Sequence, residues 1–189
     1  MSNAVDENIL IFVRQIRERS RENAESLGLL HDRSLTSNVV SILRQELDSL
    51  VRVIFLLSQT DHEYRGALIE ASVNGCQWTK KGGKGRITDR EMVELSSSLF
   101  NWAKNVYEFG CAFIHLSNFH DYATRDPMEI ISPAERSTIA LYMNYYHLTH
   151  FSPMVTFPEI MPYLPVVFEK IRSNTECYLK NLEEGRDLD

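Results

Sequence analysis

The sequence predicts an all-α protein, an up-and-down bundle of five or six helices with one flexible loop rich in glycine and lysine. Residues 1–74 and 86–126 contain few glycines and no proline, since all six prolines lie at or after Pro127. Apolar residues in these stretches recur at steps of three and four, the period of an amphipathic helix. No alternating pattern of useful length predicts a strand.

The first three helices are expected at about residues 6–26, 37–57 and 61–73. Gly28 follows the first of these stretches, at a position where glycine commonly ends a helix. The second stretch carries the clearest apolar stripe, at spacings of three and four: Val39, Ile42, Leu43, Leu47, Leu50, Val53, Ile54 and Leu57.

The remaining helices are expected after the glycine-rich loop. The chain contains two capping boxes, which mark helix starts: Thr88 with Glu91, and Ser132 with Glu135. The first box is expected to begin one long helix reaching about residue 123, and the second a helix reaching about residue 150. The long helix is apolar nearly all round, which indicates a place at the bundle centre or between two copies of a homodimer. A last helix is expected at about residues 161–182.

Length and composition bound the class of protein. The 189 residues predict one domain, 1–189, ending in an acidic tail at 183–189. Twenty Lys and Arg against 26 Asp and Glu give a net charge of −6, which argues against a protein that coats DNA. We expect a cytoplasmic protein without membrane contact, because the chain has no apolar run of about 18 residues and no secretory signal pattern.

Residues 79–86 read Thr-Lys-Lys-Gly-Gly-Lys-Gly-Arg and have the most unusual composition in the chain. Glycine lets backbone N–H groups approach a phosphate, and the cations add charge. The predicted phosphate-binding residues of this loop are Lys80, Lys81, Lys84 and Arg86. The order of residues is not that of a Walker loop. The alternative interpretation is a solvated, mobile loop without a ligand.

Arg44, Asp48 and Arg52 lie at i, i+4 and i+8 of the second predicted helix. Their spacing places two cations and one carboxylate on the same helix face. The ladder is interpreted as an ion network between helices, and alternatively as an anion clamp in which Arg44 and Arg52 bind phosphate.

The run Leu116-Ser-Asn-Phe-His120, late in a predicted long helix, resembles the corresponding stretch of HEPN domains. The resemblance implies an all-α domain that binds nucleotides or RNA. In the family, an Arg and a His four to six residues later converge in a dimer cleft on an RNA phosphodiester. The resemblance implies catalytic roles for His120 and for the nearby Asn118. It implies the same for His115, which stands where the family has Arg. Because His115 lacks a permanent charge, we expect degenerate or absent ribonuclease chemistry. The alternative interpretation of His115 is a buried core histidine.

His147 and His150 lie at i, i+3, a spacing that allows both imidazoles to bind one metal ion. We nevertheless expect no metal and no cofactor, because no paired Glu-x-x-His motif and no H-E-x-x-H motif accompanies them. Three functions therefore stay open. The first is a HEPN-like nucleotide- or RNA-binding domain, the second a homodimeric interaction protein without catalysis, and the third a metal-dependent helical-bundle enzyme.

Overall fold

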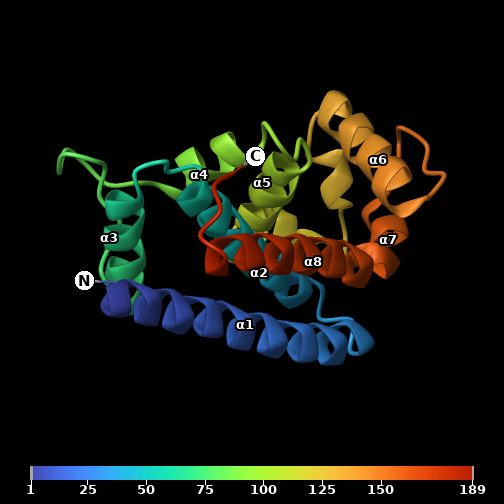
Figure 1. Cartoon of the computed structure of the whole chain (residues 1–189). Coiled ribbons are helices and arrows are strands. Elements are labelled where there is room, and N and C mark those ends of the chain that lie inside the picture. Colours follow the sequence, from blue (N-terminus) through green and yellow to red (C-terminus); the bar gives the residue numbers. More distant parts are fainter. Residues whose placement is uncertain (1, 189) are drawn as a thin grey trace.

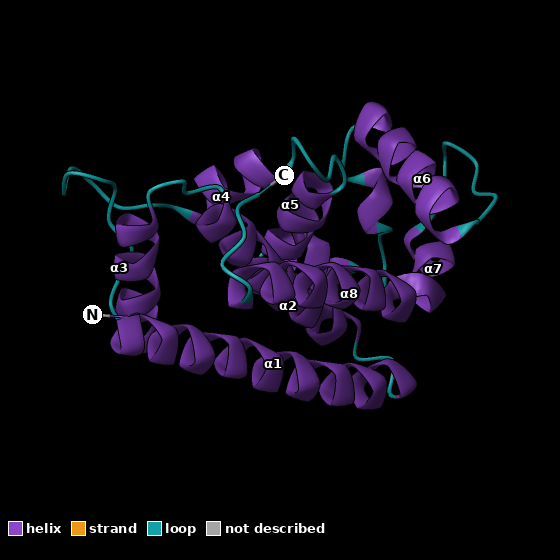
Figure 2. Ribbon diagram, viewed as in Figure 1, coloured by secondary structure: helices purple, strands orange, loops and turns teal. Residues whose placement is uncertain are grey.

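The computed structural model describes the backbone of residues 2–188 and the side chains of residues 7–188. It confirms the all-α fold, because the regular elements among these residues are helices (Figure 2). The one β-type pairing described is an isolated antiparallel bridge between Thr79 and Arg86, at the base of the glycine-rich loop.

The longer helices are α1 (Ser2–Asp32), α2 (Thr36–Leu57), α3 (His62–Val73), α4 (Asp89–Ser96), α5 (Ala103–Ile114), α6 (Pro133–His147) and α8 (Leu164–Glu183). Four short helical segments connect them: η1 (Asn118–Asp121), η2 (Pro127–Glu129), α7 (Phe157–Ile160) and η3 (Met161–Tyr163). The predicted second and third helices match α2 and α3 closely, and both predicted capping boxes begin helices, α4 and α6.

Helix α2 lies at the centre of the bundle and packs against α1, α3, α4, α5 and α8 (Figure 1). Its residues Leu47, Leu50, Val51, Val53 and Ile54 are fully buried. Together with Leu56, which is also fully buried, these positions cover more than half of the helix circumference, and a helix with so wide an apolar face is stable only when neighbours surround it. The prediction of one long helix over residues 88–123 is wrong, and so is its placement at the bundle centre; the alternative placement between two copies stays a prediction.

Serine side chains explain the first break in that segment. The hydroxyls of Ser96, Ser97 and Ser98 donate to backbone carbonyls one turn earlier, at 2.7–2.8 Å. Such bonds compete with the helical ladder, and α4 ends at Ser96. A second break follows at His115, whose backbone is extended, and Ser117 then caps η1.

The end of α1 also differs from the prediction. Gly28 lies inside the helix, which continues to Asp32, and the left-handed residue is Ser34 at φ 56°. The Leu35 amide donates to the Leu30 carbonyl and the Ser34 amide to the His31 carbonyl, which is a Schellman arrangement. A glycine with helical φ does not stop a helix when other residues supply the cap.

The acidic tail predicted at residues 183–189 packs against the bundle. Arg65, on α3, donates to the Arg186 carbonyl at 3.1 Å and pairs with the Asp187 carboxylate. The Leu188 amide donates to the Leu57 carbonyl at 2.9 Å, at the C-terminus of α2. The tail therefore satisfies a carbonyl that the helix end leaves without an intrahelical partner.

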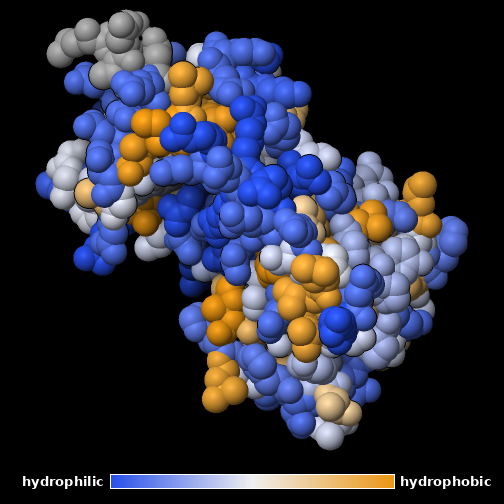
Figure 3. All heavy atoms as spheres, turned by 90° about the horizontal axis from the view of Figure 1, so that it is seen from below, coloured by the Kyte–Doolittle hydropathy of each residue, from blue (hydrophilic) through white to orange (hydrophobic). Residues whose placement is uncertain are grey.

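No helix among the described residues has both the length and the apolar character needed to cross a bilayer. On the face seen in Figure 3, hydrophobic atoms form separate areas within a largely hydrophilic surface. Exposed apolar residues scattered in this way are normal for a folded domain. The prediction of a homodimer stays untested.

Candidate functional site

The Arg44–Asp48–Arg52 ladder forms an internal ion network. Arg52 donates to Asp48 at 3.1 Å. Asp89, at the start of α4, pairs with Arg44 at 3.3 Å and with Arg52 at 3.2 Å. The Arg44 guanidinium is buried 4.2 Å from the ring centroid of Tyr107. These contacts tie α2 to α4 and α5, and they occupy the guanidinium groups that the anion-clamp interpretation needs.

Two of the four loop cations are also paired. Lys80 pairs with Glu91, and Lys81 Nζ lies 2.6 Å from an Asp61 carboxylate oxygen. The Lys80 ammonium, followed by the Thr88 amide and hydroxyl, lowers the pKa of Glu91 to about 2.

The base of the loop is closed by backbone hydrogen bonds from Lys80 to Gly85 at 2.9 Å and from Ile87 to Trp78 at 3.1 Å. Among residues 7–188, no carboxylate pairs with Lys84 or Arg86. These two cations stay available for a phosphate. The flexibility of the loop stays a prediction.

Of the HEPN-like residues, Asn118 and His120 share the short helix η1, whereas His115 lies outside any helix. His115 and Asn118 are exposed, and His115 follows the end of α5 with an extended backbone. His120 is half-buried in η1, where its Nδ1 accepts from the Ser117 amide at 3.4 Å. The expectation of a partly buried His115 on a helix is therefore wrong. No described hydrogen bond or ion pair joins these residues to Arg44 or Arg52.

His150 is exposed, whereas His147 is half-buried. Within residues 7–188, no three His, Cys, Asp or Glu side chains gather closely enough to hold a metal ion. His147 instead lines a cavity, together with Lys170. Burial, and secondarily the positive charge of Lys170, lower the pKa of His147 below its usual value.

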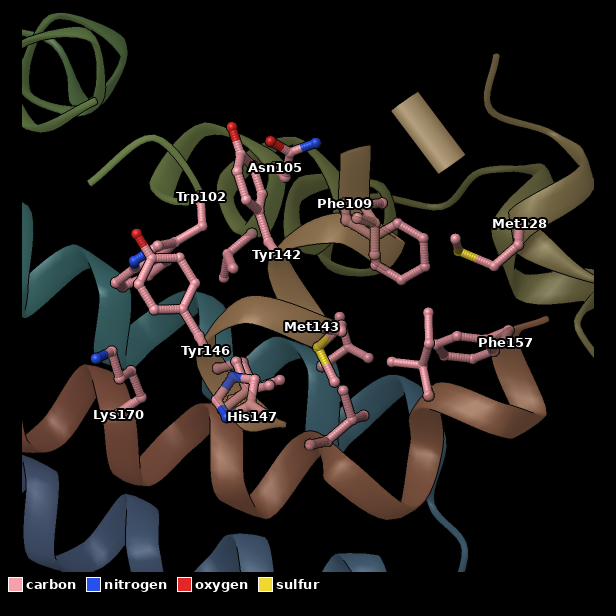
Figure 4. Close-up of a pocket in the computed structure, with 17 residues that line it drawn as sticks. Trp102, Asn105, Phe109, Met128, Tyr142, Met143, Tyr146, His147, Phe157 and Lys170 are labelled. Atoms are coloured by element: carbon pink, nitrogen blue, oxygen red, sulfur yellow. The ribbon is translucent and has the colours of Figure 1, made fainter. Parts of the chain in front are cut away.

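This cavity, of about 100 Å³, lies between α2, α5, α6 and α8 (Figure 4). Its wall is almost entirely apolar, with the following residues as its main surfaces: Leu43, Val106, Phe109, Met128, Met143 and Phe157. Phe109 and Phe157 pack against each other at one end, with their rings tilted by 50° and the ring centroids 5.5 Å apart. No pattern in the sequence predicts this cavity.

The cavity exists because the backbone of α6 lies at a distance from the other helices of the bundle. Unlike α2, α6 makes few close backbone approaches to other helices, and long side chains such as Tyr142, Met143 and Tyr146 fill part of the distance. The following loop is held onto α6: buried Arg136 donates to the Met154 and Val155 carbonyls at 2.6 and 2.7 Å. These hydrogen bonds hold the loop against α6, which forms one wall of the cavity.

Lys170, Tyr146 and Trp102 lie at the other end of the cavity, although the surface they present to it is apolar. Lys170 Nζ lies 5.0 Å from the ring centroid of Tyr146, and the Tyr146 ring meets that of Trp102 edge-on at 6.5 Å. Figure 4 shows these three side chains together at one end, with Phe109, Met128 and Phe157 at the other. The aromatic content of the 88–123 segment could have indicated Trp102, but no sequence pattern singled out Lys170.

Comparisons of the chain with protein-family models, with curated protein sequences and with solved structures found no match. The fold and site define an all-α domain that has, among its described residues, an apolar cavity open to solvent on one side. The resemblance to HEPN domains stays a prediction.

Proposed function

We propose that this protein is a binding domain for a small molecule whose apolar part enters the cavity between α5, α6 and α8. The observation that carries the proposal is the cavity itself, in a domain whose central helix is tightly packed. Protein interiors contain few voids larger than a water molecule. Filling about 100 Å³ of apolar space is worth about 2 kcal/mol, at about 24 cal/mol per Å³.

Benzene is a suitable probe, because it binds in apolar cavities without needing a polar partner. We expect it to shift the NMR signals of the Met128 and Met143 methyl groups, which line the cavity. Met92 is buried outside the cavity and Met154 is exposed, so both signals serve as internal controls. Equal shifts at all four methyl groups, or no shifts, would contradict the proposal.

A variant separates cavity binding from surface binding. Val106→Phe places a ring in the cavity wall and should abolish the benzene shifts while the helical circular dichroism is kept. Leu141→Phe is the matched control, because Leu141 lies on the exposed side of α6 at 62% exposure. Benzene binding that survives Val106→Phe in a folded protein would show that the cavity is not the site.

Nucleotide or RNA binding is a second proposal. The observation in its favour is that Lys84 and Arg86 have no carboxylate partner among the described residues, and that His115 and Asn118 are exposed. Binding of single-stranded RNA should weaken with added salt, because the loop cations release counterions. Loss of binding in a Lys84→Met, Arg86→Met variant would support this function, and no binding by the wild type at low salt would exclude it.

A further inference from the structure

The cavity offers a ligand almost no hydrogen-bonding group, although several of its lining residues are polar. The Lys170 ammonium lies 5.0 Å from the ring centroid of Tyr146, and the Lys170 side chain meets the cavity with its carbon atoms. In Figure 4 the Lys170 nitrogen and the Tyr142 hydroxyl point away from Met143, which lies in the middle of the view. The polar residues of this wall therefore contribute apolar surface.

His147 completes the wall without adding a charge at neutral pH. Burial first and Lys170 second lower the pKa of its imidazole, so the ring is neutral at pH 7. Among residues 7–188, no Asp or Glu lines the cavity. A charged or hydrogen-bonding group that entered would lose its bonds to water and gain almost none from the wall, which is costly.

We propose that the part of the ligand that enters the cavity is an uncharged hydrocarbon group without hydrogen-bonding atoms, and that polar groups of the ligand stay at the open side. The inference rests on the proposed function of the cavity and names the class of ligand. Because one side of the cavity is open to solvent, a ligand with a single polar end can keep that end in water. A ligand with polar groups at both ends must bury one of them.

The cavity volume limits the size of the hydrocarbon group. Benzene, with six carbon atoms, binds in an engineered apolar cavity of about 150 Å³. A space of about 100 Å³ accordingly encloses about four carbon atoms, and the open side allows one edge of a six-carbon ring to protrude. We therefore expect mesitylene, a benzene ring with three methyl groups, not to bind, although it is more apolar than benzene.

The experiment compares two rings of nearly equal size, 1,4-difluorobenzene and hydroquinone. Hydroquinone has hydroxyl groups where the first compound has fluorine atoms, so one hydroxyl must enter the cavity. In NMR titrations of the Met128 and Met143 methyl signals, we expect hydroquinone to bind at least about tenfold more weakly. Hydroquinone binding as tightly as 1,4-difluorobenzene, or mesitylene binding more tightly than benzene, would overturn the proposal.

A polar side chain placed in the wall should reduce this preference. Met143→Gln puts an amide where the thioether was, and it should bring the two affinities within about threefold of each other, measured at the Met128 methyl signal. Met154→Gln makes the same change at an exposed methionine and is the matched control, which should keep the wild-type preference. If circular dichroism shows that Met143→Gln does not fold, Met128→Gln takes its place, measured at the Met143 methyl signal. A wild-type preference in the folded cavity variant would overturn the proposal.

Benzene distinguishes the class of ligand from the function of the cavity. If benzene binds and Val106→Phe abolishes its binding, equal affinities for hydroquinone and 1,4-difluorobenzene would overturn the hydrocarbon inference and leave the cavity function intact. Failure of benzene and 1,4-difluorobenzene together would overturn the proposed function as well.

Discussion

Charged side chains that are buried in this protein act as ties between segments. Glu46 is fully buried on α2 and accepts from Ser20 at 2.5 Å and Asn23 at 3.0 Å, both on α1. Arg65 and Arg136 similarly use their guanidinium groups to hold backbone carbonyls of distant loops. Because a buried charge is costly unless it is hydrogen-bonded, each of these contacts specifies where a segment must lie.

His147 makes stability depend on pH. Burial first and Lys170 second lower its pKa, so the folded state binds a proton less readily than the unfolded state, whose value is about 6.5. The stabilisation is complete above pH 6.5 and is lost as pH falls below that value toward the lowered pKa.

We therefore expect the thermal midpoint of His147→Gln to fall less between pH 7.5 and pH 5 than that of the wild type. His150→Gln alters an exposed histidine and should keep the wild-type dependence. An unchanged pH dependence in His147→Gln would contradict the assignment.

At the scale of helices, the close approach of α2 and α5 depends on one glycine. A Cβ atom built on Gly110 would lie 2.7 Å from the Arg44 Cβ, which is near the backbone and has little freedom to move. Gly28, by contrast, is exposed on α1 with nothing within 4 Å of the same position. The two glycines therefore have opposite roles, although both lie inside helices.

Gly110→Ala should destabilise the protein by about 1–3 kcal/mol, because α2 and α5 must separate. Gly28→Ala should stabilise it by about 0.5–1 kcal/mol, because alanine favours the helix and meets no neighbour. Urea denaturation measures both free energies of unfolding. A Gly110→Ala variant as stable as Gly28→Ala would show that the helices do not pack as described.

At the scale of the whole molecule, the C-terminal tail closes the end of the bundle where α2 stops and α3 begins. Arg65 joins the tail to the segment between α2 and α3, since it donates to the Gln59 carbonyl at 2.8 Å and pairs with Asp187 in the tail. Arg65 first, and then His62, lower the pKa of Asp187. Because the pKa of Asp187 is lowered in the folded protein, its carboxylate stabilises the packing of the tail above pH 4. This stabilisation is lost as pH falls through the lowered pKa.

Asp187→Asn should release the tail without unfolding the bundle. We expect faster hydrogen exchange at the Leu188 amide, which donates to the Leu57 carbonyl, and unchanged exchange in the centre of α2. Glu184→Gln, which removes a carboxylate paired with Arg186 in the same tail, is the control and should leave Leu188 protected. Equal exchange of Leu188 in Asp187→Asn and the wild type would show that the ion pair does not hold the tail.

The sequence by itself determined the helical class, the bounds of α2 and α3 and the starts of α4 and α6. Apolar periodicity and capping boxes act between residues within one or two turns, so they can be read locally. The serines whose hydroxyls bond to carbonyls at the end of α4 are visible in the sequence, but serines make the same bonds inside helices, so they do not predict a break by themselves.

Only the tertiary structure decided that α2 lies at the centre, that Asp89 occupies both Arg44 and Arg52, and that α6 stands away from the bundle. The end of the cavity near Lys170 has the same origin. Trp102, Tyr146 and Lys170 come from three separate segments, and each alone has an ordinary sequence context. Their meeting depends on how far apart α5, α6 and α8 are held, and the sizes of side chains distant in sequence set that distance.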